Sequence, residues 1–201
     1  MDKKAQVWVE TVIYTLIFLT LIGISLAIVV PVVEKQKDKN TIQNTVNSLN
    51  DFDSTILNIK RAGIGNVREI RFNLGEGKFI IDGKNNSLIF EILESSYPYS
   101  EPGISVRLVG TNIKSETKKN GRKYNIKLTL PYDGSANITI NDKDEIKEYF
   151  PASVPYVFFI ENRGKVPFGD CFSDPDQCPA GSTCFNGQCV PDNTVINIYE
   201  R

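Results

Sequence analysis

The chain has 201 residues, with 23 basic and 24 acidic side chains and no histidine. The formal net charge of −1 gives the chain as a whole no general attraction to nucleic acid or to anionic lipid. Without histidine, Ser-His-Asp and Cys-His catalysis are excluded, and the commonest metal ligand is missing. The sequence also contains no nucleophile motif and no phosphate-binding loop. We therefore expect no enzyme and no cofactor.

The first element in chain order is an uncharged stretch of 23 residues, from Thr11 to Val33. As a helix it would be about 35 Å long, which exceeds the roughly 30 Å hydrocarbon core of a bilayer. A cleavable secretory signal has a shorter apolar region, of about 7–15 residues, followed by a small-residue cleavage site. Here the stretch ends in Pro31-Val32-Val33-Glu34, without such a site. We therefore expect residues 6–33 to form a membrane-spanning helix.

The second element, residues 34–62, has the pattern of an amphipathic helix. Its apolar residues recur at spacings of three and four, which places them on one face. They are Ile42, Val46, Leu49, Phe52, Ile56 and Ile59. Gly63 and Gly65 predict the end of the helix. One helix from about Gln6 to about Arg61 is expected, with a kink at Pro31, which removes a backbone hydrogen bond.

From residue 63 to residue 168 the apolar period changes to two, which predicts strands. Alternation is clear at Ile70–Leu74, Ile104–Leu108, Tyr124–Leu130, Ile138–Ile140 and Tyr156–Ile160. Turn signals separate these segments, namely Asp82-Gly83, Asn120-Gly121, Asp133-Gly134 and Arg163-Gly164. Residues 193–201 predict a last strand, over 194–199. The expected fold is α+β: a long N-terminal helix packed on an antiparallel sheet or sandwich of about six to eight strands.

Residues 169–192 hold all four cysteines: Cys171, Cys178, Cys184 and Cys189. An even, clustered set beyond a membrane segment is typical of two disulfides in an oxidising compartment, and three pairings are open. A four-thiolate zinc site is the alternative, although no Cys-x-x-Cys pair is present. Asp170, Asp174 and Asp176 lie near these cysteines but match no EF-hand spacing, so a solvated acidic loop is expected rather than a calcium site. Because lysines flank both ends of the apolar stretch, the cysteines decide the expected orientation, with the N-terminus cytoplasmic.

The segment Lys3-Lys4-Ala5-Gln6-Val7-Trp8-Val9-Glu10 resembles the class III signal peptide of archaeal type IV pilins and archaellins. In that family a membrane peptidase cuts just before the apolar helix, and the mature chain carries glutamate at its fifth position. Cleavage between Ala5 and Gln6 would remove residues 1–5 as a leader and make Glu10 the fifth mature residue. Ala5 departs from the family, in which glycine is commonest before the cut.

This resemblance implies a structural subunit of an extracellular type IV pilus-like filament. It also implies the partners of such a subunit: copies of itself or other pilins, a prepilin peptidase, an assembly ATPase and a membrane platform protein. The chain would lie in the cell membrane before assembly, with its C-terminal part outside, and in a cell-surface filament afterwards. Glu10 would pair with the new amino group of Gln6, on a neighbouring subunit or its own chain. The alternative is a monomeric, membrane-anchored ectodomain with a binding or adhesion role, in which Glu10 lies in the headgroup region.

The cysteine region resembles small secreted disulfide folds in which Asn186-Gly187 turns a hairpin, and this likeness implies the pairs Cys171–Cys184 and Cys178–Cys189. Asn85 and Asn137 begin Asn-x-Ser/Thr triplets and are candidate N-glycosylation sites. Basic residues surround Asn120-Gly121. They suit either phosphate binding or a charged, exposed hairpin that resists pairing with another strand edge. We expect the charged hairpin, and no nucleic-acid partner. Tyr97-Pro98-Tyr99 is a candidate adhesive loop.

Overall fold

The computed structural model describes residues 3–165, 168–171, 178 and 182–200. One helix, α1 (Lys3–Ala62), is followed only by strands in this part of the chain. The strands are β1 (Val67–Phe72), β2 (Lys78–Asp82), β3 (Ser87–Ser95), β4 (Ser105–Arg107), β5 (Lys114–Asn120), β6 (Lys123–Pro131), β7 (Ala136–Ile140), β8 (Ile146–Tyr149), β9 (Tyr156–Gly164), β10 (Phe168–Asp170), β11 (Ser182–Phe185), β12 (Gln188–Pro191) and β13 (Thr194–Glu200). The expected α+β fold class is confirmed.

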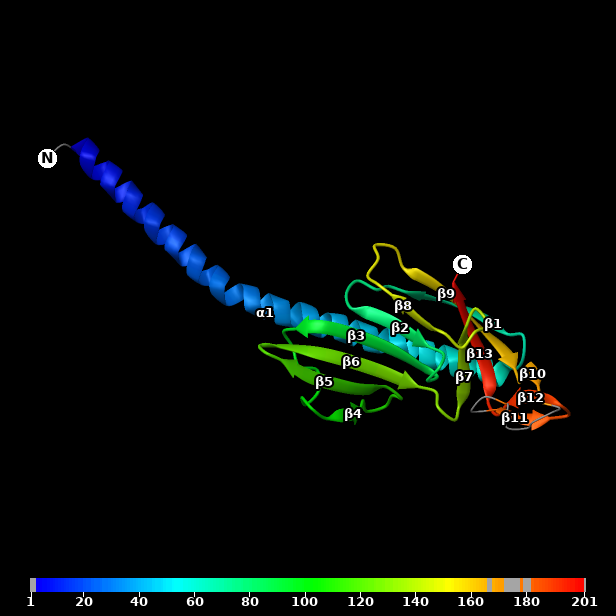
Figure 1. The fold of residues 1–201 in the computed structure, drawn as a ribbon. Helices are drawn as coiled ribbons and strands as arrows, with labels where there is room; N and C mark the ends of the chain where they lie inside the picture. The colour runs from blue at the N-terminus through cyan, green and yellow to red at the C-terminus, as the bar shows by residue number, and fades with distance from the viewer. Residues whose placement is uncertain (1–2, 166–167, 172–177, 179–181, 201) are drawn as a thin grey trace.

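Helix α1 is continuous over 60 residues and includes Pro31. Figure 1 shows that its direction changes between the N-terminal part, which extends alone, and the part that lies along the strands. Lys60 and Arg61 lie in the last turn, where their positive charges interact favourably with the negative end of the helix dipole and stabilise the helix. The chain then leaves the helix through Gly63 and Gly65, whose φ angles of 93° and 81° suit glycine. The expected helix and its stop signal are therefore confirmed.

The strands form three sheets. The largest has the order β4-β5-β6-β3-β2-β8, a second has the order β1-β9-β13-β7, and a small third sheet has the order β10-β12-β11. Every pairing between these strands is antiparallel except that of β13 with β7, so the second sheet is mixed. The described part of the chain has more strands than the six to eight expected. The strands β2 and β3 were missed because they carry runs of consecutive buried residues instead of a strict alternation.

The core lies between the second half of α1 and the two larger sheets. All six apolar residues of the predicted helix face are buried, with exposed fractions between 0% and 5%. Four phenylalanine rings meet at its centre: Phe52 of α1 lies 5.7 Å from Phe72, 5.5 Å from Phe79 and 5.7 Å from Phe158, measured between ring centroids. The amphipathic half of the helix therefore covers the sheets, as its period predicts.

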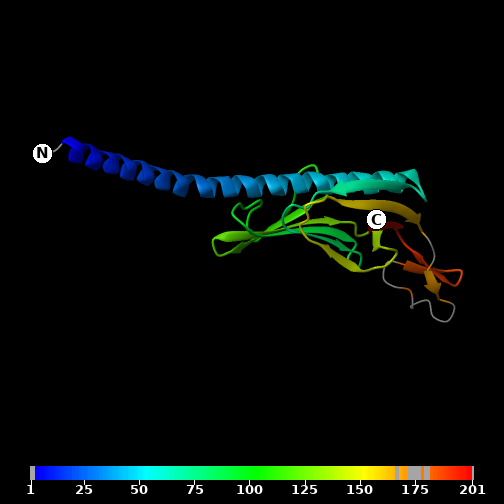
Figure 2. The same ribbon diagram turned by 90° about the horizontal axis from the view of Figure 1, so that it is seen from above.

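The head is elongated along the helix, and the two ends of the molecule differ. Figures 1 and 2 show the N-terminal part of α1 projecting away from the head at one end. The small sheet β10-β12-β11 lies at the other end. After this small sheet the chain returns as β13, which inserts between β9 and β7. The predicted last strand is thus confirmed, and it ties the cysteine region to the head.

Candidate functional site

The most unusual surface of the molecule is the first half of α1. Between Trp8 and Val33 every large apolar side chain is exposed, from 39% for Ile22 to 74% for Trp8. An 18-residue window here has a mean hydropathy of 2.8, and none of it is buried in the molecule. The helix is long and apolar enough to cross a membrane. A soluble chain would not leave so much apolar area in water, so this half of the helix needs lipid or protein around it.

Glu10 is the only charged residue between Trp8 and Val33. Its Oε1 atom accepts a hydrogen bond of 3.2 Å from the hydroxyl of Tyr14, one helical turn further on. The hydroxyls of Thr15 and Thr20 donate to helix carbonyls four residues back, so these polar groups are satisfied without water. Tyr14 was not singled out in the sequence, although its spacing of four from Glu10 is the signal for such a bond.

Ala5 and Gln6, the expected cleavage site, lie in the backbone of α1. Their side chains are outside the described part of the structure, as are Met1 and Asp2. Strands β11 and β12, which carry Cys184 and Cys189, lie at the end of the head away from the N-terminal part of α1 (Figure 1).

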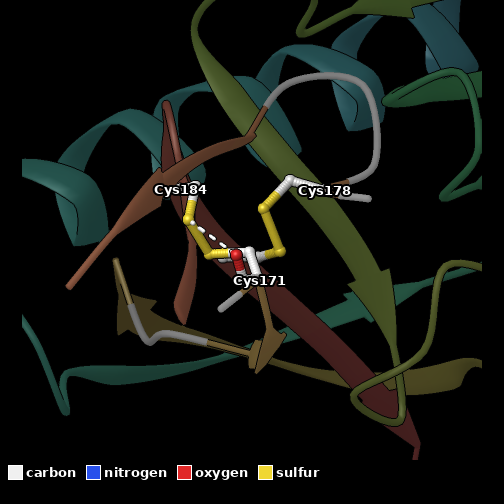
Figure 3. The surroundings of a disulfide bond; sticks show 4 residues. Cys171, Cys178 and Cys184 are labelled. Carbon is white, nitrogen blue, oxygen red and sulfur yellow. Dashed lines mark hydrogen bonds between the residues drawn. A yellow bond between two sulfur atoms is a disulfide. The ribbon is translucent and has the colours of Figure 1, made fainter. Parts of the chain in front are cut away.

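The four cysteines form the pairs Cys171–Cys184 and Cys178–Cys189, with Cα–Cα distances of 5.9 and 5.4 Å. Figure 3 shows the two bonds side by side. This is the pairing that the likeness to small secreted folds implies. Three of the sulfur atoms lie within 4.8 Å of one another, but each is bonded to another sulfur, so none is available as a zinc thiolate. Asp174, Asp176 and the side chain of Asp170 lie outside the described residues.

Strands β11 and β12 form the hairpin that Asn186-Gly187 predicts. Both turn residues have positive φ, 50° and 79°, as a two-residue primed turn requires. The Gly187 carbonyl accepts a hydrogen bond from the backbone of Cys171, and Cys171 and Cys189 are buried. Beside the turn, Phe185 is 66% exposed. Among the described side chains of this region, Cys171, Cys189 and Pro191 are buried. With so few buried groups, the cross-links carry much of its stability.

The two candidate glycosylation triplets differ in position. Asn85 is exposed on the β2–β3 turn, where its Nδ2 donates to Asp82 Oδ2 at 2.7 Å. Asn137 is half-buried on β7. In both triplets the hydroxyl residue is buried: Ser87 is 5% exposed, and Thr139 is 8% exposed and donates to Asn197. A transferase that needs this hydroxyl therefore has access to it before the head folds and not afterwards.

Where α1 meets the head, three residues of the helix contact three different segments of the head. Glu34 forms an ion pair of 3.6 Å with Lys123 at the start of β6. Lys37 forms an ion pair with Glu76 in the β1–β2 loop, and this hydrogen bond raises the pKa of the Lys37 ammonium. Asp38 accepts a hydrogen bond from the backbone of Ser96, just after β3. These contacts join the head to the helix directly after its apolar stretch.

The candidate adhesive loop Tyr97-Pro98-Tyr99 lies at this same end. Lys39 of the helix lies 5.9 Å from the centre of the Tyr97 ring. Tyr97 and Tyr99 pack against the core cluster, and burial raises the pKa of the Tyr99 hydroxyl. The loop is therefore partly committed to packing, which leaves it little free surface for adhesion.

At the other end of the head, Asn162 of β9 binds the end of α1. Its Nδ2 donates to the carbonyl of Ile59 at 3.1 Å, and its Oδ1 accepts from the backbone of Gly164 at 2.8 Å. Because Asn162 is 2% exposed, these bonds are made in a buried environment. Sequence reasoning marked Arg163-Gly164 as a turn and missed the asparagine, which carries no local signal. In the structure Gly164 is the last residue of β9.

Two open grooves of about 690 and 710 Å³ run beside α1. Asp53 lines the first, and its Oδ2 accepts a hydrogen bond of 2.8 Å from Asn112. The hydroxyl of Tyr132 is buried, and the described residues provide no hydrogen-bond partner for it. Burial raises the pKa of this hydroxyl strongly, and the negative charge of Asp53 adds to the effect. This arrangement is part of the packing between helix and sheet.

No family model matches the chain, and neither a curated protein nor a solved structure matches it. The function must therefore be argued from the residues. The architecture, a long apolar N-terminal helix joined to a β-sheet head with two disulfides, is compatible with that of pilins.

Proposed function

We propose that this protein is a structural subunit of a type IV pilus-like surface filament. The observation that carries the proposal is the contrast within α1, where an exposed apolar half continues without a break into a half whose apolar face is buried against a folded head. In the membrane, lipid would cover the bare half. In a filament, the corresponding halves of neighbouring subunits would cover one another. The head would then form the outer surface.

The N-terminal sequence favours a filament over a simple anchor. A plain anchor needs only apolar residues, whereas this helix carries Glu10 near its start, preceded by two lysines and a small residue at pilin-like spacing. A carboxylate within hydrocarbon costs at least about 3 kcal/mol unless it has a partner. The Tyr14 hydroxyl is one partner, and the amino group released at Gln6 by cleavage would supply the opposite charge.

The competing function is a monomeric, membrane-anchored ectodomain that binds a partner outside the cell. The exposed apolar helix supports it equally well, because lipid alone would cover that surface. Shearing filaments from cells and washing them free of membrane separates the two functions. Recovery of this chain in the filaments, with Gln6 as its first residue by mass spectrometry, supports the pilin. A chain found only in membranes, with its first residues intact, contradicts it.

A substitution of Glu10 tests the assembly step directly. Glu10→Gln keeps the size and polarity of the side chain and its capacity to accept from Tyr14, but removes the charge. We expect normal membrane insertion and cleavage and strongly reduced filament assembly, because the acid pairs with the new amino group and sets the register between subunits. Quantifying the chain in sheared filaments and in membranes measures this.

Glu34→Gln is the matched control, since it removes one carboxylate from the same helix at the other end of the apolar stretch. It should assemble like the wild type. If Glu10→Gln also assembles normally, Glu10 has no pairing role and is an interfacial residue of an anchor.

A further inference from the structure

We propose that the β5–β6 hairpin tip, residues 118–123, rests on the lipid headgroups and binds their phosphate groups while the chain is in the membrane. This inference rests on the membrane-inserted stage of the proposed function. It assigns a ligand class, the anionic phospholipid surface, to a part of the head that lies far from the cysteine region and plays no part in pairing subunits through Glu10.

The position of the tip follows from its ion pair with the helix. Lys123 lies 3.6 Å from Glu34, which is the first residue after the uncharged stretch Thr11–Val33. A bilayer measures about 30 Å across its hydrocarbon core and about 40–45 Å with its headgroups, so each headgroup layer is roughly 5–7.5 Å deep. If Thr11–Val33 crosses the hydrocarbon, Glu34 and the side chain paired with it lie in the headgroup layer. Figure 1 is consistent with this position of the tip, because the linked ends of β5 and β6 lie at the end of the head from which the N-terminal part of α1 extends.

The composition of the tip is suited to binding phosphate groups. It reads Lys118-Lys119-Asn120-Gly121-Arg122-Lys123, with four basic residues in six. Lys118 pairs with Glu116 and Lys123 with Glu34. Lys119 and Arg122 are exposed and have no acidic partner among the described residues. Their charges are thus free to meet an anion, and Arg122 can bind two phosphate oxygens at once.

The surroundings of the tip agree with contact to a membrane surface. Leu93, at the end of β3 near the tip, is 69% exposed. An exposed leucine beside lysines is typical of surfaces that lie at the boundary between lipid and water. Glu94 and Glu101, also exposed at this end of the sheet, offset part of the charge, so the attraction is expected to be local to the turn. A basic residue near an anionic bilayer favours the bound state by about fivefold.

Two exposed lysines at the other end of the head provide an internal control. Lys84 lies on the β2–β3 turn and Lys143 on the segment between β7 and β8, where Gly83 bonds to Glu145. The paired strands place these turns at the opposite end of the sheet from residues 118–123. They are exposed lysines on the same head that would lie away from the bilayer.

The test uses the full chain in nanodiscs of phosphatidylcholine alone or mixed equally with phosphatidylglycerol. A water-soluble acylating reagent labels lysines, and mass spectrometry gives the rate at each site. In the anionic discs we expect labelling of Lys118 and Lys119 to fall about fivefold, with recovery at high salt, while Lys84 and Lys143 are unchanged. In Lys119→Gln/Arg122→Gln the protection of Lys118 should be lost, whereas Lys84→Gln/Lys143→Gln should retain it.

Equal labelling of the tip in both bilayers, in chains that have inserted, overturns lipid binding and leaves the filament proposal standing. Protection of the tip that arises only in assembled filaments also overturns it, because the partner is then a second copy of the chain. A chain that does not insert into nanodiscs overturns both proposals.

Discussion

The two halves of α1 belong to one continuous helix but are built for different surroundings. In the first half, residues 8–33 are apolar on every side and every large apolar side chain is exposed. In the second half, apolar residues occupy one face, and six of them are no more than 5% exposed. Polar groups differ in the same way. Among the described side chains, the partner of Glu10 is Tyr14 of its own helix, whereas Asp53 accepts a hydrogen bond from Asn112 of the head.

The difference shows what the apolar pattern of a helix specifies. Spacings of three and four provide a single stripe, which a β-sheet layer can cover. An apolar surface on all sides cannot be covered by one sheet and requires an environment that surrounds the helix. The change between these patterns falls near Glu34, and there the ion pairs from Glu34 and Lys37 to the head begin.

Equivalent truncations in the two halves should have very different effects on folding. Phe52→Ala removes a ring that contacts three other phenylalanines and should destabilise the head by about 3–5 kcal/mol through the cavity that remains. Phe18→Ala removes the same atoms from a side chain that is 63% exposed, and should change head stability by less than about 0.5 kcal/mol. Denaturant unfolding of the head in detergent, followed by circular dichroism in the β region, measures both.

Phe18→Ala thus serves as the matched control for Phe52→Ala. Similar losses of stability in the two variants would mean that the first half of α1 folds back on the head in solution, and the contrast between the halves would then be wrong.

The cysteine region adds a third case, in which cross-links replace a core. The two disulfides close short loops, with sequence separations of 13 and 11. Replacing Cys171 and Cys184 together by serine should destabilise this region by about 2–4 kcal/mol. The four-phenylalanine core should be affected less, because it lies under α1 and not in the small sheet. Hydrogen exchange should therefore accelerate in β11 and β12 far more than in β3 and β6.

Uniform acceleration across the head would contradict a separately stabilised region and would show that β13 transmits the loss to the larger sheets. Cys178→Ser with Cys189→Ser is the companion variant, and it should give the same local pattern.

Several parts of this structure could be predicted from local sequence because local chemistry decides them. The helix from near Gln6 to near Arg61, its buried face, the Asn120-Gly121 hairpin and the last strand all follow from periodicity and turn residues. The order of strands could not be predicted, because it depends on which distant segments pair. The parallel pairing of β13 with β7 is one example, and the buried bonds of Asn162 to the helix end are another. The ion pair of Glu34 with Lys123 likewise joins residues 89 positions apart, and no local sequence pattern predicts it.

The smallest expected effect at neutral pH concerns Tyr132, which is buried near Asp53 under the covered half of α1. Its hydroxyl is buried without a hydrogen-bond partner among the described residues, so Tyr132→Phe should leave stability at pH 7 unchanged or slightly raised. Because burial raises the pKa of this hydroxyl in the folded state, it stays protonated there, while the unfolded chain ionises near pH 10. The wild type should therefore lose about 1.4 kcal/mol of stability per pH unit above about 10 from this group alone, and Tyr132→Phe should lose that much less. Denaturant midpoints between neutral pH and pH 11 measure the difference in slope; parallel pH profiles for the two proteins would show that water reaches Tyr132 and that this part of α1 is less well covered than the structure indicates.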